Sequence, residues 1–383
     1  MATTAAAVEV PPAPETIVWL ETPEALNQWL DRVSGLPLVL DTEFERVNTF
    51  HPIPGLVQLG AGSEFFLVDP GIAEQSDRFR SVLGDPGVIK LLYAMSEDLE
   101  LFRHWLDLEP RGVIDLQIGA ALAGAGFSVG YARLVEELFG ETLDKTATRS
   151  DWLKRPLSEA QQRYAVEDIR FLEPLYRWVI PRLRERGLEQ AMIEESARFA
   201  QEQSGQENPE QHYLKLRAGW TLKPTQQLAL RELVLWREQQ CRKLDRPRNR
   251  VLADPILIAI AERMPDTARA LSGIDGLPPV VVRKYGELLV SLVNQARESG
   301  DASTLKRIAP PLTRDEQGVL KEIKKRFRKS AEVSGVPIEL LAPRKRLEKV
   351  IQDRSVRDQA FFQGWRSKVL EPVRTEIEEL LRS

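Results

Sequence analysis

Residues 36–43, Leu-Pro-Leu-Val-Leu-Asp-Thr-Glu, decide the fold of the first half of the chain. The unbroken apolar run that ends at Leu40 suits a central strand covered on both faces. In open α/β sheets, functional side chains gather at the carboxyl ends of such strands, which is where Asp41 lies. Because side chains alternate along an extended chain, Asp41 and Glu43 point to one side and Thr42 to the other. The two carboxylates can therefore share one site.

A second acidic motif follows another apolar run. Residues 89–94, Ile-Lys-Leu-Leu-Tyr-Ala, predict a buried strand, after which Ser96-Glu97-Asp98-Leu99 opens a predicted helix. Ser96 is the expected N-cap, which places Asp98 in the first helical turn. That carboxylate could simply complement the helix dipole. Its place after a buried strand, like that of Asp41, leads us to expect it in the same site.

The third motif, Tyr164-Ala165-Val166-Glu167-Asp168, lies in a stretch of helical periodicity from residue 157 to 178. Tyr164 and Asp168 are four residues apart, so both project from one helical face. Alone, the pair is read equally well as a core tyrosine and a solvent-exposed aspartate. With the other motifs it completes a set of four carboxylates, which can hold two divalent cations about 3.5–4 Å apart. The phenol could orient an attacking water beside them.

The spacing of apolar runs predicts a sheet flanked by helices. The short polar turn Gly62-Ser63-Glu64 favours a hairpin, and a hairpin makes the sheet mixed rather than parallel. The strands are expected near residues 37–43, 55–62, 64–69, 88–94 and 112–116.

The acidic blocks Leu40-Asp41-Thr42-Glu43-Phe44, Ser96-Glu97-Asp98-Leu99 and Tyr164-Ala165-x-x-Asp168 resemble the DEDD superfamily of 3′-5′ exonucleases. That superfamily divides by whether a Tyr four residues, or a His five residues, precedes the last Asp. Tyr164 and Arg163 occupy those positions, so the chain is similar to the tyrosine branch. The stretch between residues 143 and 157, with Asp144-Lys145, Arg149-Ser150-Asp151-Trp152 and Arg155-Pro156-Leu157, resembles the ribonuclease D family in particular.

The resemblance implies a fold, a reaction and a set of roles. The fold is an α/β, ribonuclease H-like mixed-sheet exonuclease domain followed by two all-helical HRDC-type domains. The reaction is hydrolysis of RNA phosphodiesters from the 3′ end, releasing nucleoside 5′-monophosphates, with transfer RNA precursors as the implied substrates. Tyr164 would position the nucleophilic water. The four metal ligands would be Asp41, Glu43, Asp98 and Asp168.

The residue types at this site favour hard cations. Carboxylate oxygens suit Mg²⁺ or Mn²⁺. Zinc is disfavoured, because Cys241 is the only cysteine and none of the three histidines falls in a motif. We therefore expect two divalent cations, either Mg²⁺ or Mn²⁺.

The charge of the chain is unevenly distributed. The net charge of −4 divides into −13 for residues 1–200, +3 for residues 201–300 and +6 for residues 301–383. The acidity thus lies with the predicted exonuclease domain, where cations would offset part of it. The basic excess lies downstream, where RNA phosphates would meet it.

The second half of the chain reads as helical. Residues 201–211 are polar and predict a linker. The pattern that follows, in residues 211–295, resembles an HRDC domain, a small helical module that binds nucleic acid. Within it, Trp220 and Trp236 are expected in the core. Five cations in nine residues repel one another unless an anion compensates them, so they are candidate phosphate contacts, although a solvated basic loop is the simpler alternative. These cations are Arg242, Lys243, Arg246, Arg248 and Arg250.

Two assignments rest on position and resemblance. Residues 301–383, with a basic run from Lys321 to Lys329, resemble a second HRDC-like domain. Lys145 and Arg149 lie between the second and third acidic motifs, where they could contact the scissile phosphate or form structural salt bridges.

The remaining sequence features concern the N-terminal tail, the cellular compartment and the alternative functions. Residues 1–15 predict a disordered tail before an exonuclease domain at 16–200, and the tail lacks the basic start of a signal peptide. With one cysteine and no apolar run long enough to span a bilayer, we expect a cytoplasmic protein that needs no membrane and no obligate protein partner. Three alternatives remain: a DNA-directed exonuclease, a nucleic-acid-binding protein without catalysis, and an RNA-independent scaffold of helical modules.

Overall fold

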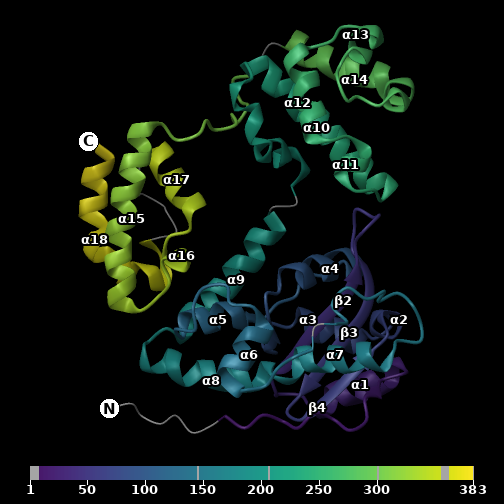
Figure 1. Ribbon diagram of the computed structural model, residues 1–383, viewed down its shortest axis with the longest axis vertical. Coiled ribbons are helices and arrows are strands. Elements are labelled where there is room, and N and C mark those ends of the chain that lie inside the picture. Colours follow the sequence, from purple (N-terminus) through teal and green to yellow (C-terminus); the bar gives the residue numbers. More distant parts are fainter. Residues whose placement is uncertain (1–7, 145, 206–207, 300–301, 355–361, 383) are drawn as a thin grey trace. The chain divides into compact units, whose positions relative to one another are not determined.

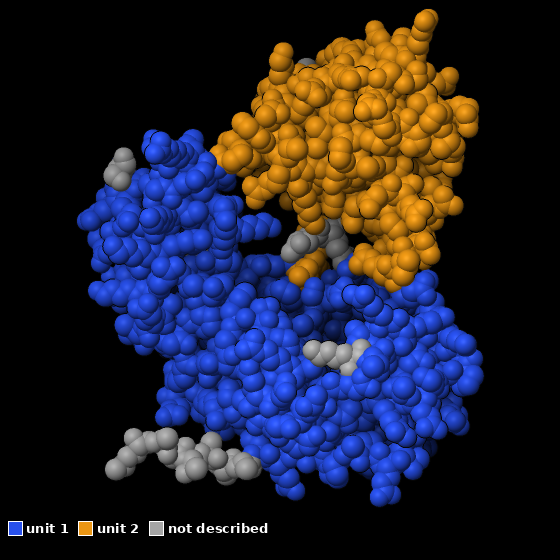
Figure 2. Space-filling model, viewed as in Figure 1, with its two compact units in different colours: residues 1–45, 52–202, 312–383 blue, residues 46–51, 203–311 orange. Residues whose placement is uncertain are grey.

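The computed structural model describes residues 8–144, 146–205, 208–299, 302–354 and 362–382 of the 383. The chain divides into two compact units, coloured separately in Figure 2. Unit 1 comprises residues 1–45, 52–202 and 312–383, and unit 2 comprises residues 46–51 and 203–311. Among the described residues, we find no helix with the length and apolarity needed to cross a membrane.

Unit 1 contains a six-stranded sheet, of which β2, β3 and β4 are labelled in Figure 1. The strands are β1 (Val18–Trp19), β2 (Leu38–Glu45), β3 (Ile53–Ala61), β4 (Glu64–Val68), β5 (Lys90–Leu92) and β6 (Val113–Asp115). Their order is β1-β4-β3-β2-β5-β6. The β2/β3 and β3/β4 pairs are antiparallel and the other three pairs are parallel, so the predicted mixed sheet and its hairpin are confirmed.

Strand β2 is longer than its apolar run. It continues beyond the predicted end to Glu45, with a shift in register between Glu43 and Phe44. Asp41 therefore lies within the strand, paired with Gln58 of β3, rather than at its end.

Helices cover both faces of the sheet. Leu40 and Leu59 belong to one hydrophobic cluster with Leu30 of α1, Phe79 of α3 and Phe102 of α4. The alternate side chains of β2 and β3 belong to a second cluster with helices α5, α7 and α8. The helices before α7 are α1 (Pro23–Arg32), α2 (Pro70–Glu74), α3 (Asp77–Gly84), α4 (Ser96–Leu106), α5 (Leu116–Leu122) and α6 (Tyr131–Phe139).

The helical periodicity after residue 157 belongs to two helices, not one. Helix α7 (Glu159–Arg170) begins with a capping box in which Ser158 and Gln161 bond each other's backbone. It ends at Phe171, whose N–H donates to the Tyr131 hydroxyl (3.3 Å) instead of continuing the helix. Helix α8 (Leu172–Glu185) then follows. The break leaves Tyr164 and Asp168 together on α7.

The segment after α8 corrects the predicted linker. Helix α9 (Glu189–Gly205) extends through residues 201–205, the first half of the stretch that we predicted as a linker. Ion pairs of Arg198 with Glu195 and Glu202 support this helix.

At the N-terminal end of the described chain, residues 8–15 contain no helix or strand, but the Pro11 carbonyl accepts a hydrogen bond from Arg170 (2.9 Å).

Unit 2 is helical, as predicted. Trp236 lies in its core with 5% of its surface exposed, but Trp220 is 43% exposed, so the prediction that both are core anchors is wrong for Trp220. Trp220 lies on a short 3-10 helix at the rim of the core, before the long helix that carries Trp236. The elements of unit 2 are η1 (Pro209–Lys215), η2 (Arg217–Thr221), α10 (Pro224–Leu244), α11 (Arg248–Val251), α12 (Asp254–Arg263), α13 (Ala268–Ser272) and α14 (Pro279–Ser299).

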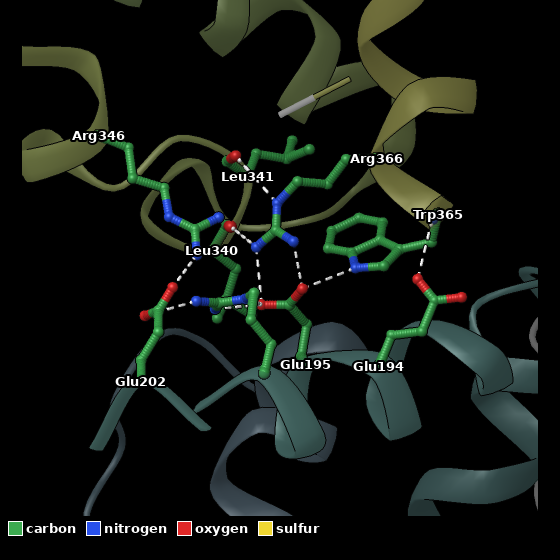
Figure 3. A network of polar contacts seen from close by, with 9 residues as sticks. Glu194, Glu195, Glu202, Leu340, Leu341, Arg346, Trp365 and Arg366 are labelled. Carbon is green, nitrogen blue, oxygen red and sulfur yellow. Dashed lines mark hydrogen bonds and ion pairs between the residues drawn. The ribbon is translucent and has the colours of Figure 1, made fainter. Parts of the chain in front are cut away.

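The last helices belong to unit 1 and pack on α9. They are α15 (Arg314–Ser334), α16 (Ile338–Leu341), α17 (Arg344–Asp353) and α18 (Gly364–Arg382). Figure 3 shows the contact, in which Arg366 of α18 points at Glu195 of α9. The Arg366 side chain donates to both carboxylate oxygens of Glu195 and also to the Leu340 and Leu341 carbonyls. We call Glu195, Arg198 and Arg366 the Glu195 cluster.

Candidate active site

The first and third acidic motifs meet where α7 lies against β2. Carboxylate oxygens of Asp41, Glu43 and Asp168 all lie within 4.8 Å of one another. Asp41 and Glu43 project from the same face of β2, as the alternation of the strand predicts, and α7 brings Asp168 over that face. Three of the four predicted metal ligands are thus brought together by the fold.

Asp98 adjoins this group from the first turn of α4, as predicted. Its Oδ1 accepts a hydrogen bond from the Thr42 hydroxyl at 2.5 Å, and its charge raises the pKa values of both Asp41 and Glu43. The sequence predicted Thr42 to face away from the carboxylate pair. The structure gives it the role of holding the fourth carboxylate.

The start of α4 differs from the prediction. The helix begins at Ser96 and its N-cap is Met95, so the predicted capping by Ser96 is wrong. The two N–H groups that precede the helix, those of Ala94 and Met95, donate instead to the carboxylate of Asp115 at the end of β6. Sequence analysis missed Asp115, although an Asp that ends a strand and begins a helix is a typical capping residue.

Burial makes all four carboxylates reluctant to ionise. Burial, followed by the charges of its acidic neighbours, raises the pKa of Asp41 well above its ordinary value. The same causes raise the pKa of Glu43 to about 9. Burial also raises the pKa of Asp98 to about 6 and that of Asp168 to about 7, although hydrogen bonds from Thr42 and Tyr164 work against it. In the described chain, no Lys or Arg forms an ion pair with any of the four.

This donor set fits a hard divalent cation. The oxygen atoms of Asp41, Glu43 and Asp168 converge, and carboxylate oxygens are the usual ligands of Mg²⁺ and Mn²⁺. Asp98 is buried and the other three carboxylates are half-buried, so four anions without a basic partner would be destabilising here. A bound cation removes that cost, because its charge favours the ionised form of each ligand.

Tyr164 lies beside the carboxylates on α7. Its hydroxyl forms a hydrogen bond with Asp168 and lies 3.5 Å from the Thr148 hydroxyl. Burial, together with the Asp168 charge, raises the pKa of Tyr164 far above its ordinary value. The phenol therefore stays protonated and can donate a hydrogen bond at neutral pH.

A cavity of about 300 Å³ adjoins the acidic group. Asp41 and Asp168 line it together with Tyr93 and Tyr131. The two tyrosine rings meet edge to face with centroids 5.2 Å apart, and their hydroxyls are bonded to backbone carbonyls. The cavity thus offers apolar ring surfaces beside the carboxylates.

The predicted basic contacts have different outcomes. Lys145 lies outside the described residues, and Arg149 is exposed in the segment before α7. In unit 2, Arg242 and Arg248 bind the buried carboxylate of Glu238 at 3.0 and 2.7 Å. The inference that the cluster needs an external anion is therefore wrong for Arg242 and Arg248, because Glu238 of α10 compensates their charge.

The other three cations of the cluster remain available. Among the residues that the structure describes, none forms a hydrogen bond or ion pair with the exposed side chains of Lys243, Arg246 and Arg250.

Comparison with known proteins agrees with this geometry. A family model described as 3′-5′ exonuclease matches residues 17–183, and a model of the HRDC domain matches residues 226–293. Ribonuclease D of Pseudomonas paraeruginosa is 36% identical over 341 residues, which is 89% of this chain and 90% of that protein. The chain belongs to the ribonuclease D family. It is a 3′-5′ exoribonuclease, and RNA is its substrate.

Other relatives support the assignment to the ribonuclease D family. Ribonuclease D of Escherichia coli strain K12 is 35% identical over 280 residues, 73% of this chain and 74% of that protein. The crystal structure of Escherichia coli RNase D matches with a TM-score of 0.85 at 29% identity, covering 96% of this chain and 99% of that one. The prediction of an exonuclease domain followed by a helical region with an HRDC domain is confirmed.

Proposed function

We propose that this ribonuclease D family member hydrolyses the 3′-terminal phosphodiester of RNA with two divalent cations held by Asp41, Glu43, Asp98 and Asp168. The observation that carries the proposal is the group of converging, half-buried carboxylates without a basic partner in the described chain. The products are nucleoside 5′-monophosphates, released one at a time. Mg²⁺ or Mn²⁺ suits the all-oxygen donor set.

The chain's own residues would have distinct roles in this reaction. When bound, the cations help generate hydroxide and stabilise the departing 3′ oxygen. The Tyr164 hydroxyl, held beside Asp168, would orient the attacking water. Thr42 keeps Asp98 in place. The cavity lined by Tyr93 and Tyr131 provides apolar surface for part of the terminal nucleotide.

We infer that RNA is held mainly through its phosphates. Arg149 and Lys145 lie in the chain segment before α7 and would contact the backbone near the scissile bond. In unit 2, the exposed cations Lys243, Arg246 and Arg250 fit phosphate contacts that carry no sequence preference. Arg242 and Arg248 would contribute less, because Glu238 already neutralises part of their charge. Affinity should accordingly fall as salt rises.

Transfer RNA precursors are the substrates that we propose. The solved Escherichia coli relative is described as an exoribonuclease involved in structured RNA processing. An exonuclease with a separate helical, basic module can hold the folded body of such an RNA while it trims the 3′ end. DNA-directed activity is the alternative, since the same four carboxylates serve either sugar.

The deciding experiment is a time course on a 5′-labelled transfer RNA precursor and on single-stranded DNA of the same sequence. Each is incubated with Mg²⁺ or EDTA, with Asp168→Ala as the inactive control. We expect a Mg²⁺-dependent ladder that shortens from the RNA 3′ end and is absent in the variant. A ladder on DNA alone would favour the alternative substrate. Tight RNA binding without cleavage by the wild type would leave only a binding module.

Tyr164→Phe tests the role of the phenol. Removing the hydroxyl while keeping the ring should lower kcat about 10- to 100-fold, because one hydrogen-bonding group beside the water is lost, and should change KM for RNA little. Single-turnover cleavage and RNA binding in Ca²⁺ separate the two effects. Tyr176→Phe, in the following helix, is the matched control. Equal losses in cleavage and binding for Tyr164→Phe would contradict the role.

A further inference from the structure

We propose that Asp115 is a positioning residue of the cation site, acting through the turn that precedes α4. It contacts neither the carboxylate group nor the cavity, and no sequence motif marked it. The inference rests on the proposed cation site, because it concerns how one ligand of that site, Asp98, is held in place.

The contacts of Asp115 converge on two helix starts. Its side-chain Oδ1 accepts the N–H of Ala94 at 3.0 Å and the N–H of Gln117 at 2.9 Å. Its Oδ2 accepts the N–H of Met95 at 3.3 Å. The residue is only 2% exposed, so water does not compete for these bonds. One carboxylate thus caps α5 and also fixes the two residues before α4.

The turn before α4 needs such support. Ala94 has φ of 56°, a left-handed conformation that is unfavourable for a residue with a Cβ. Met95, the N-cap of α4, has an apolar side chain and cannot cap the helix itself. Strained backbone of this kind persists where the surrounding structure holds it, and it gathers at functional sites. Here the surrounding structure is the Asp115 carboxylate.

What the turn carries is Asp98. This ligand lies in the first turn of α4, three residues after Met95, and its other anchor is the Thr42 hydroxyl. Ala94 also lines the cavity beside Asp41 and Asp168. Loosening the turn would therefore shift Asp98 relative to the other three carboxylates, and a cation site tolerates only small displacements of its ligands.

The backbone of Asp115 is anchored by helix α9. Its backbone N–H donates to the Ser196 hydroxyl of α9 at 3.0 Å, and Ser196 is fully buried. Glu195, which precedes Ser196 in the sequence, binds Arg366 of the C-terminal helices. The main-chain contact with Ser196 and the side-chain contacts with α4 are separate, so substitutions can address them one at a time.

Asp115→Asn is the informative variant. Asn is as good an N-cap as Asp, so it keeps the acceptor for Ala94 and Gln117 and preserves α5. Its amide NH₂ replaces Oδ2 and cannot accept the N–H of Met95. Ser196→Ala is the matched control, since it also removes one buried hydrogen bond of Asp115 but leaves the carboxylate in place.

The experiment measures Mn²⁺ binding to the full-length protein without RNA, by electron paramagnetic resonance, alongside cleavage. We expect Asp115→Asn to bind Mn²⁺ about tenfold more weakly than the wild type, in line with other residues that orient metal ligands. At subsaturating Mn²⁺ its kcat should fall by a similar factor and should recover at high Mn²⁺. KM for RNA should stay unchanged, and Ser196→Ala should bind Mn²⁺ nearly as the wild type does.

Each other outcome is decisive. Wild-type Mn²⁺ affinity in Asp115→Asn would overturn the inference. So would equal losses of Mn²⁺ affinity and melting temperature in Asp115→Asn and Ser196→Ala, because these would reflect general loosening of the fold. Failure of the proposed site itself has a different signature: Mn²⁺ would not bind the wild type, or would bind Asp168→Asn equally well.

Discussion

Unit 1 buries carboxylates in two places and treats them in opposite ways. In the Glu195 cluster, burial would raise the pKa of Glu195, but hydrogen bonds from Arg366 and Arg198 lower it to about 2. In the candidate active site, the causes add instead of opposing one another, and the pKa of Glu43 rises to about 9. One group of carboxylates carries its own counter-charge and the other does not.

The difference separates structure from function. Arg366 is 2% exposed and Glu195 1%, and a buried charge without its partner costs several kcal/mol, about 3–5 by analogy with other proteins. The chain supplies a basic partner to Glu195. It also supplies one to Glu238 in unit 2, where Arg248 helps lower the pKa of Glu238 to about 2. In the described chain, Asp41, Glu43 and Asp168 have no such partner, and this is why we propose that a bound cation supplies their counter-charge.

Glu43→Gln is expected to have the largest effect. Loss of one charged ligand should lower cleavage about a thousandfold or more, since metal binding supplies several kcal/mol of transition-state stabilisation. In EDTA at neutral pH the same variant should melt at a higher temperature than the wild type, because Glu43, with a pKa of about 9 in the folded state, must take up a proton on folding and Gln need not. Cleavage assays and thermal unfolding in EDTA measure the two effects.

The matched control is Glu45→Gln, the same substitution two residues further along β2. Glu45 is outside the convergent group, so cleavage and melting temperature should both stay near the wild-type values. If Glu43→Gln melted at a lower temperature in EDTA, Glu43 would be a structural residue like Glu195.

Arg366→Met should show the reverse behaviour at the Glu195 cluster. It leaves Glu195 buried with Arg198 as its remaining ion-pair partner, so the free energy of unfolding should fall by about 3 kcal/mol. Denaturant unfolding measures this loss. Arg382→Met, on the same helix but 79% exposed, should cost less than about 1 kcal/mol.

A double variant sharpens the result. Glu195→Leu combined with Arg366→Met removes both charges and should recover much of the lost stability, as replacement of a buried ion pair by apolar residues often does. Equal stability of Arg366→Met and the wild type would show that the pair is not buried in solution.

Mg²⁺ should stabilise the protein by binding at the candidate active site and not at the Glu195 cluster. At a concentration 100-fold above its dissociation constant, one bound ion adds about 2.7 kcal/mol to the free energy of unfolding. The melting temperature should therefore rise with Mg²⁺ in the wild type and in Arg366→Met, and much less in Glu43→Gln. An equal rise in Glu43→Gln would place the bound Mg²⁺ elsewhere on the protein.

The sequence predicted the grouping of Asp41, Glu43 and Asp168 better than other long-range contacts, because each motif is local. Asp41 and Glu43 share a strand, Tyr164 and Asp168 share a helix, and regular periodicity determines which way each pair points. The strand that was missed, β1, has only two residues and forms solely because β4 offers it a partner. Likewise, Thr42 reaches Asp98 across 56 positions of sequence, which no periodicity reveals.

Charge compensation was harder to predict, because it depends on distant residues. The basic cluster in unit 2 read as uncompensated, yet Glu238 lies one helical turn before Arg242 and binds it together with Arg248. The pairing of Glu195 with Arg366 spans 171 positions. Residue type alone therefore does not distinguish a carboxylate that has a basic partner from one that has none; the fold is needed to tell them apart.

Acid pH should reveal the contribution of the Glu195 ion pairs to stability. Its pKa is about 2 in the folded state against an ordinary value of 4.5, so the unfolded chain takes up the proton first as pH falls. The stabilisation is therefore complete above about pH 4.5 and is lost as pH falls toward 2, at about 1.4 kcal/mol per pH unit while only the unfolded state is protonated. Denaturant unfolding of the wild type and of Glu195→Gln between these limits isolates this residue from other acidic groups. The variant should show a shallower dependence by about one proton, and parallel curves would mean that Arg366 does not keep Glu195 ionised.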